Sequence, residues 1–248
     1  MSIPPKVLEL ITRFRDGEAS FKSSNYHESD LRSEFLDPFF KALGWDIDNE
    51  QSAPEGLKEV VREARLTVHD SLRAPDYSFW LGGTRRFFVE AKKPAVNLQN
   101  DSSPAFQVRR YGWSGKLPTS IVTDFEEFVI YDCRTEPLKT DSATNSRLLY
   151  IRYTEYEDRW DEIANLFSKE AVLAGKLDSY IGKLKVQKGT STVDTVFLAE
   201  ISTWRQKLAD DMARRNPTLS QRDLNYAVQM TIDRIVFLRI SEDRGIEP

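Results

Sequence analysis

Three ionisable residues that lie near one another in the sequence suit the hydrolysis of a phosphodiester bond. Asp76 stands just before one predicted strand, and Glu90 and Lys92 stand at the end of the next. Two neighbouring carboxylates repel each other unless a cation lies between them, and hard oxygen ligands suit Mg²⁺, which also binds substrate phosphate. Lys92 can then orient an attacking water or help to deprotonate it. These residues therefore predict metal-dependent cleavage of a phosphodiester.

A predicted β-hairpin brings these groups to one place. Aromatic-rich runs over residues 77–81 and 85–91 predict its strands, and adjacent glycines supply the turn. If residues 82–84 form the loop, pairing outward places Asp76 directly opposite Glu90, with their Cβ atoms roughly 5 Å apart. A slip of one residue would send the two carboxylates to opposite faces of the hairpin. The expected common face carries Asp76, Ser78, Trp80, Phe88, Glu90 and Lys92.

Pro75-Asp76, followed after the hairpin turn by Glu90-Ala91-Lys92, resembles the PD-(D/E)XK signature of restriction endonucleases and related nucleases. The resemblance implies that Asp76 and Glu90 are metal ligands together with the carbonyl oxygen of Ala91, and that Lys92 is the catalytic lysine. It also implies Mg²⁺ as the cofactor, with Mn²⁺ as a substitute. The alternative is an exposed hairpin whose Glu90 and Lys92 form an ordinary surface ion pair, worth under about 1 kcal/mol.

A helix predicted over residues 27–43 precedes the hairpin, and Pro38 should kink or restart it. Glu34 stands beside Phe35 among the apolar positions of this helix, where an unpaired charge is expensive. The segment resembles the opening helix of the same nuclease superfamily, in which a helix glutamate often points into the active site. The resemblance implies that Glu34 is a further metal or metal-water ligand. The alternative is that Glu34 reaches solvent or an arginine.

Another predicted helix, over residues 105–113, follows the hairpin. Gln107 and Tyr111 are four residues apart and so share a face of this helix. Gln-x-x-x-Tyr after an acid-x-lysine strand resembles a motif in type I restriction motor subunits and RecB-like nucleases, which implies that these side chains support the active site. Arg109 and Arg110 between them are predicted contacts to backbone phosphate. The alternative is an amphipathic helix whose Gln and Tyr merely pack or face water.

The charge distribution favours a nucleic-acid partner, although the whole chain of 248 residues has a net charge of −4. Between Arg62 and Lys116, ten basic residues stand against five acidic ones, so the hairpin lies in a segment that attracts phosphate. Lys93 in this segment is a further predicted phosphate contact, although such unevenness is also common on solvated faces. The single cysteine, Cys133, excludes an internal disulfide and a thiolate zinc cluster. The sequence has no predicted membrane span or signal peptide, so we expect a cytoplasmic protein.

The remaining predicted elements complete an α/β domain that is followed by helices. Strands predicted over 119–123, 127–132 and 148–153 follow the second helix. The order strand, hairpin, helix, strand, strand resembles that of a restriction-endonuclease-like fold, in which helices flank a mixed central sheet. We therefore expect a nuclease domain over residues 1–155 and a helical region over residues 156–248.

The helical region carries a second resemblance. Its last helices are predicted over 193–214 and 220–243, with Ser220 as the N-cap of the final one. Residues 224–246 are similar to the helical connector that joins nuclease and methyltransferase domains in type IIG restriction-modification polypeptides. No methyltransferase signature follows, so we expect a chain truncated before that domain, and S-adenosylmethionine only in the missing domain. A short family member that dimerises through this helix is the alternative.

Together these features predict a Mg²⁺-dependent endonuclease domain of a restriction-modification enzyme that hydrolyses double-stranded DNA. Its expected partners are methyltransferase and target-recognition domains in the same or a partner polypeptide. One alternative is a catalytically silent module of the same fold that binds DNA or a partner protein. Another treats the helical region as an interaction scaffold.

Overall fold

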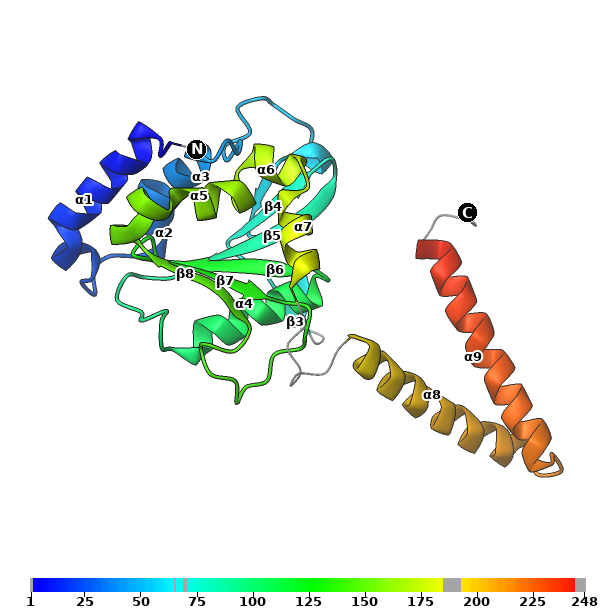
Figure 1. The fold of residues 1–248 in the computed structure, drawn as a ribbon. Coiled ribbons are helices and arrows are strands. Elements are labelled where there is room, and N and C mark those ends of the chain that lie inside the picture. The colour runs from blue at the N-terminus through cyan, green and yellow to red at the C-terminus, as the bar shows by residue number, and fades with distance from the viewer. Residues whose placement is uncertain (1, 65, 69–70, 185–192, 244–248) are drawn as a thin grey trace. The chain divides into compact units, whose positions relative to one another are not determined.

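The computed structural model describes residues 2–64, 66–68, 71–184 and 193–243 (Figure 1). The chain divides into a first unit, Met1–Thr190, and a second unit, Ser191–Pro248. Within the described ranges, no helix has both the length and the apolar character needed to cross a membrane.

The first unit is built around a six-stranded sheet with the strand order β1-β4-β5-β6-β7-β8 (Figure 1). Strands β5 and β6 run parallel, and the other neighbours in this sheet pair antiparallel. A parallel pair needs a crossover connection, which here contains helix α4 (Ser102–Ser114). The strands are β1 (Val60–Arg62), β4 (Tyr77–Leu81), β5 (Thr84–Ala91), β6 (Thr119–Thr123), β7 (Glu127–Asp132) and β8 (Arg147–Arg152), with β2 (Leu66–Val68) and β3 (Ser71–Arg73) as a separate pair.

Helices cover both faces of this sheet. One face packs against α4, where Ala105 and Val108 of the helix join Val122 and Val129 of the sheet in one buried cluster. The other helices of the first unit cover the opposite face (Figure 1). They are α1 (Pro5–Phe21), α2 (Glu28–Leu31), the π-helical turn η1 (Arg32–Leu36), α3 (Asp37–Ala42), α5 (Tyr156–Phe167), α6 (Lys169–Leu173) and α7 (Lys176–Lys183), and the connections contain the short 3-10 turns η2 (Glu55–Leu57) and η3 (Tyr153–Glu155). This mixed sheet flanked by helices confirms the predicted fold class.

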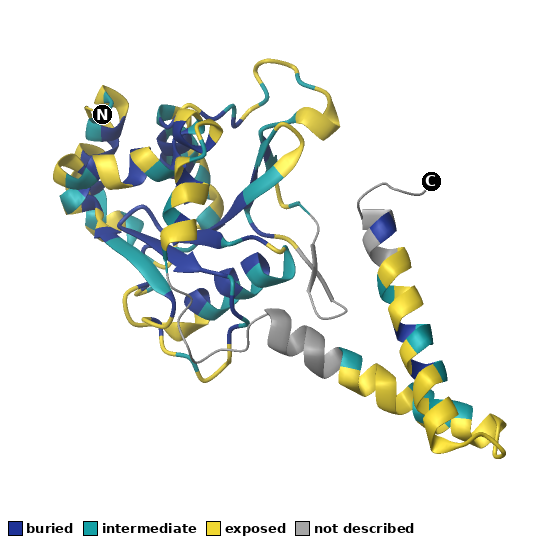
Figure 2. Ribbon diagram, turned by 45° about the vertical axis from the view of Figure 1, so that its right-hand side comes forward, coloured by how far each residue is buried: buried dark blue, intermediate teal, exposed yellow. Residues whose placement is uncertain are grey.

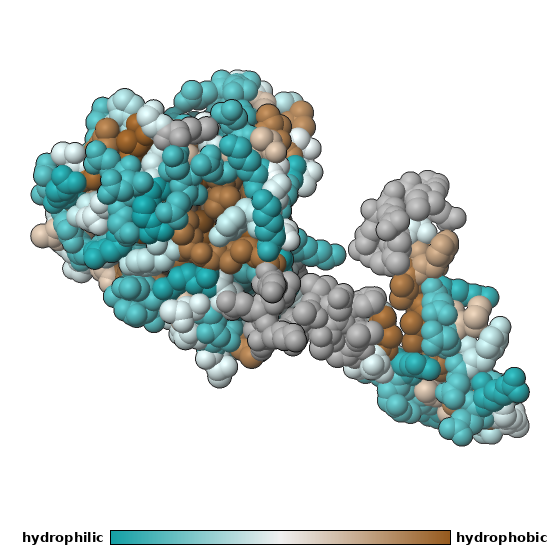
Figure 3. Space-filling view, in the orientation of Figure 1, coloured by the Kyte–Doolittle hydropathy of each residue, from teal (hydrophilic) through white to brown (hydrophobic). Residues whose placement is uncertain are grey.

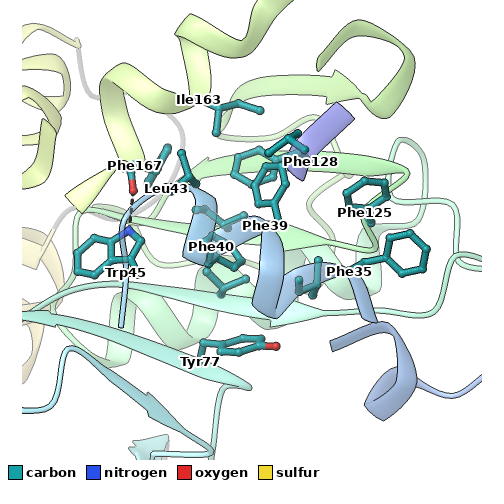
Figure 4. Close-up of a cluster of buried hydrophobic side chains, with 14 of the residues drawn as sticks. Phe35, Phe39, Phe40, Leu43, Trp45, Tyr77, Phe125, Phe128, Ile163 and Phe167 are labelled. Carbon is teal, nitrogen blue, oxygen red and sulfur yellow. Dashed lines mark hydrogen bonds between the residues drawn. The ribbon is translucent and has the colours of Figure 1, made fainter. Parts of the chain in front are cut away.

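Aromatic side chains dominate the larger core (Figure 4). The Phe39 ring of α3 lies 5.6 Å from the Tyr156 ring of α5, measured between ring centroids. The Trp45 indole N–H donates a 2.8 Å hydrogen bond to the backbone carbonyl of Phe167 at the end of α5. Helix α5 therefore completes the core of the first unit. The first unit extends beyond residue 155, where the sequence predicts the border between the nuclease domain and the helical region.

The predicted helix over residues 27–43 forms as three consecutive segments, α2, η1 and α3. Pro38 stands in the first turn of α3, and the turn before it widens so that the Asp37 N–H donates to the carbonyl of Arg32. The interruption predicted at Pro38 is thus a wide π-helical turn. Such a turn adds a residue to the helical repeat and changes which side chains share a face.

The second unit is a pair of helices, α8 (Val193–Arg215) and α9 (Gln221–Asp243). Ser220 caps α9 as predicted, because its hydroxyl accepts a 3.2 Å hydrogen bond from the Asp223 N–H. Much of the pair is exposed (Figure 2), including the large side chains of Tyr226 and Phe237, which are 69% and 67% exposed. Figure 3 shows apolar side chains on this pair. Within the second unit, α9 therefore presents apolar surface that the described part of α8 leaves uncovered.

Candidate active site

The turn of the β4–β5 hairpin is tighter than the sequence suggested. Gly82 and Gly83 have φ angles of +57° and +74°, the left-handed values that a two-residue type I′ turn requires. Leu81 therefore pairs with Thr84, and the predicted three-residue loop with Leu81 facing Arg85 is wrong. Glycine tolerates positive φ at both positions, so the shorter turn forms without strain.

A register shift further along the hairpin compensates for the shorter turn. The shift lies between Phe79 and Trp80 and restores the expected pairing, so that Tyr77 pairs with Val89. Asp76 and Glu90 are the next residues outward along the two strands, as the predicted register requires. The bulge therefore keeps both carboxylates on one face of the hairpin.

Asp76 is held by two donors. Its Oδ2 accepts a 2.8 Å hydrogen bond from the Ala91 N–H, and its Oδ1 lies 2.9 Å from Arg32 Nη1. Burial raises the pKa of Asp76, although the Ala91 N–H and the Arg32 guanidinium both act to lower it. The side chain is 17% exposed, so its carboxylate stays within reach of a ligand.

Glu90 and Lys92 form a buried ion pair. Lys92 Nζ lies 2.8 Å from Glu90 Oε1, and the two side chains are 15% and 6% exposed. Glu90 Oε2 is buried and has no hydrogen-bond partner among the described residues. Burial raises the pKa of Glu90 to about 7, against the opposing effect of Lys92. The alternative of an ordinary surface ion pair is therefore excluded by burial.

Helix α4 brings Gln107 and Tyr111 to the same carboxylate. Gln107 Nε2 donates a 2.5 Å hydrogen bond to Glu90 Oε1, and Gln107 Nε2 also lies 3.0 Å from the Tyr111 hydroxyl. Asp101 is the N-cap of this helix, and its carboxylate accepts a hydrogen bond from the Ser103 N–H. The Gln-x-x-x-Tyr spacing thus places the Gln107 amide against Glu90 and the Tyr111 phenol against that amide.

The basic residues predicted to contact phosphate differ in position. Arg109 is fully buried and ion-paired at 2.7 Å with Asp141, so it holds a loop in place and cannot reach DNA. The Arg110 guanidinium is only partly buried and lies 5.9 Å from the centre of the Phe106 ring. Lys93 is also partly exposed, directly after the site lysine. Arg110 and Lys93 remain predicted phosphate contacts, and Arg109 does not.

Glu34 does not join the site. Its carboxylate lies 2.5 Å from Arg13 Nη2 on α1, and its side chain is 36% exposed. The contact with Arg13 matches the alternative given for Glu34, in which its carboxylate reaches an arginine. Glu34 is two residues after Arg32, and two residues take an α- or π-helical turn through about half a revolution. Because Arg32 faces Asp76, Glu34 faces away from the hairpin.

Glu28 is a further carboxylate of this helical segment, which the sequence reasoning did not single out. Burial is the main cause of the raised pKa of Glu90, and the charge of Glu28 adds a smaller effect in the same direction. For Lys92, burial lowers the pKa, whereas the charges of Glu90 and, to a lesser extent, Glu28 raise it. Glu28 stands in the first turn of α2, four residues before Arg32, and so shares that residue's helix face. The spacing of four residues between Glu28 and Arg32 is the sequence signal that could have indicated this shared face.

The oxygen atoms of this site fit a hard divalent cation. The described residues contain no group of three or more histidine, cysteine, aspartate or glutamate side chains placed to hold a metal ion by themselves. Asp76, Glu90 and the carbonyl of Ala91 supply only oxygen donors, which suits Mg²⁺ because this ion retains several waters. The buried Glu90 Oε2 without a partner is the observation that favours a bound cation.

Comparisons with known proteins give one close similarity and two negative results. No family model matches the chain, and no solved structure matches it. Over its whole length the chain is 39% identical to the type II restriction enzyme and methyltransferase RM.Eco57I of Escherichia coli. The chain spans 25% of the length of that relative. This similarity supports a relationship to restriction-modification enzymes.

Proposed function

We propose that this chain is the metal-dependent endonuclease part of a restriction-modification enzyme and that it hydrolyses phosphodiester bonds of double-stranded DNA. The observation that carries the proposal is the buried Glu90–Lys92 pair, whose free Glu90 Oε2 lies on the same hairpin face as Asp76. A solvent-screened surface pair needs no such burial. The similarity to RM.Eco57I supports the same class of enzyme.

Each residue of the site has a role in this proposal. Asp76, Glu90 and the Ala91 carbonyl hold Mg²⁺ or Mn²⁺, and Glu28 adds negative charge beside them. A bound ion of this kind neutralises charge on the phosphate and makes water a stronger nucleophile. Lys92 orients the attacking water from its position beside Glu90. Gln107 fixes Glu90 Oε1 by its hydrogen bond and leaves the other oxygen free.

We further infer that the chain works beside methyltransferase and target-recognition domains. The name of RM.Eco57I joins restriction and methylation in one protein, and this chain matches a quarter of it. The exposed apolar side chains of α9 support a connector that packs against a neighbouring domain. S-adenosylmethionine is then a cofactor of the methyltransferase domain alone.

A catalytically silent module that binds DNA or a partner protein is the second candidate. One observation favours it: Arg32 and Lys92 already neutralise Asp76 and Glu90 within the site. Metal binding separates the two candidates. A nuclease site should bind Mn²⁺ in calorimetry and lose that binding in Glu90→Ala, whereas a silent module should bind no Mn²⁺.

The test of cleavage compares Lys92→Met with a matched lysine variant. The chain is incubated with supercoiled plasmid and Mg²⁺, with EDTA as the metal-free control. We expect Lys92→Met to reduce cleavage by about 10² to 10⁴-fold, the usual contribution of one proton-handling group. Lys176→Met on α7 removes an exposed lysine that, within the described ranges, donates a hydrogen bond to the surface residue Asn165, and it should cleave normally. Cleavage by Lys92→Met at the wild-type rate would refute the assignment.

A further inference from the structure

One guanidinium lies between two carboxylates of very different exposure at the edge of the site. Arg32 Nη1 lies 2.9 Å from Asp76 Oδ1 and 3.2 Å from Glu63 Oε1. The side chains of Asp76 and Glu63 are 17% and 67% exposed. Arg32 begins the π-helical turn η1, a type of turn that is frequent at functional sites.

We propose that Arg32 is a displaceable cation: it holds Asp76 in the metal-free enzyme and passes to Glu63 when Asp76 takes a divalent cation. This inference rests on the proposed function, because it assumes that Asp76 is a metal ligand. It assigns Arg32 and Glu63 a role as positioning residues that act through Asp76.

The hydrogen bonds of Asp76 show why Arg32 and a metal ion compete. Asp76 Oδ2 accepts a hydrogen bond from the Ala91 N–H, so a metal ion that binds Asp76 through Oδ1 leaves that hydrogen bond intact. Arg32 occupies that same Oδ1. The other nearby cation, Lys92, is already paired with Glu90 at 2.8 Å. Asp76 therefore needs Arg32 while the site lacks a metal, and a divalent ion and the guanidinium would repel each other at one oxygen.

Glu63 is placed to receive the released guanidinium. Its backbone N–H donates a 3.0 Å hydrogen bond to the Asp76 carbonyl, so the two residues are fixed relative to each other. Glu63 has a φ of +51°, a left-handed conformation that is costly for a residue other than glycine and that often marks functional sites. The Glu63 carboxylate already lies within ion-pair distance of Arg32. A small movement of the Arg32 side chain would complete the exchange.

The test measures Mn²⁺ affinity by calorimetry in the absence of DNA. We expect Arg32→Met to bind Mn²⁺ about three- to tenfold more tightly, because one partly exposed ion pair no longer competes. Arg32→Gln is a second variant of the same kind, for use if the apolar side chain disturbs folding. Arg13→Met is the matched control, because Arg13 pairs with Glu34 outside the site, and its affinity should equal that of wild type.

Glu63→Gln tests the receiving carboxylate by a double-mutant cycle. We expect this variant to weaken Mn²⁺ binding in the wild-type background and to have a smaller effect in the Arg32→Met background. Equal effects in both backgrounds would overturn the role of Glu63. Weaker or unchanged binding in both Arg32→Met and Arg32→Gln would overturn the inference alone. Absence of Mn²⁺ binding by the wild-type chain would overturn the proposed function together with it.

Discussion

Replacement of Glu90 by glutamine should change how the stability of the protein depends on pH. Burial raises the pKa of Glu90 from 4.5 to about 7. The folded chain therefore holds this proton more tightly than the unfolded chain does. The stability that the protonated group contributes is fully present below about pH 4.5 and is lost as the pH rises through about 7.

The size of the effect follows from the same two values. The difference between 4.5 and about 7 corresponds to about 3 kcal/mol of folding free energy once Glu90 is fully ionised. Only 4% of the residue is exposed, so solvent screening reduces this figure little. Glu90→Gln cannot ionise, and it should lack this pH-dependent loss.

The assay is urea unfolding in buffer with EDTA, from about pH 5 to about pH 8. We expect the free energy of unfolding of Glu90→Gln, relative to wild type, to rise by up to about 3 kcal/mol over this range. Glu34→Gln is the matched control, because its carboxylate is 36% exposed and lies outside the site. Because Glu90 is intact in this variant, it should keep the pH-dependent loss of stability that wild type shows. If the free energies of unfolding of Glu90→Gln and wild type change with pH by the same amount, the raised pKa assigned to Glu90 is refuted.

Two further predictions concern the helix glutamates and the buried arginine. Glu28→Gln should lower the rate of plasmid cleavage by at least about tenfold, because it removes charge beside Glu90 and Lys92, whereas Glu34→Gln should cleave at the wild-type rate. Asp141→Ala should lower the free energy of unfolding by about 3–5 kcal/mol in urea titration, because it leaves the Arg109 guanidinium buried without its carboxylate. Cleavage that depends on Glu34, or an Asp141→Ala variant as stable as wild type, would contradict these assignments.

The hairpin could be predicted because its constraints are local. Alternation along each strand and a glycine pair at the turn suffice to bring Asp76 opposite Glu90. The type of turn and the bulge could not be predicted separately, since one residue fewer in the loop and one more in the strand give the same outer register. The predicted register was correct because these two differences cancel.

The helix before the hairpin shows where local reasoning fails. A regular helical repeat makes Glu34 a neighbour of the apolar face, but Glu34 lies inside the π-helical turn, where the repeat is longer. The adjacent residues Arg109 and Arg110 pose a similar problem. The sequence around the two arginines gives no reason to expect one of them to be buried. Arg109 is the buried one because it pairs with Asp141, which lies in a loop distant in the sequence. The change from strands to helices near residue 155 likewise does not reveal that α5 completes the core of the first unit.

The burial of the Glu90–Lys92 ion pair is explained better by a functional role than by a contribution to stability. Taking two charges out of water costs several kcal/mol each, and well-packed apolar side chains in their place are often as stable or more so. The raised pKa of Glu90 indicates that Lys92 compensates only part of this cost. A second cation near the partnerless Glu90 Oε2 would supply the remainder. A contribution to folding therefore explains the pair poorly, and its burial supports the metal site proposed above.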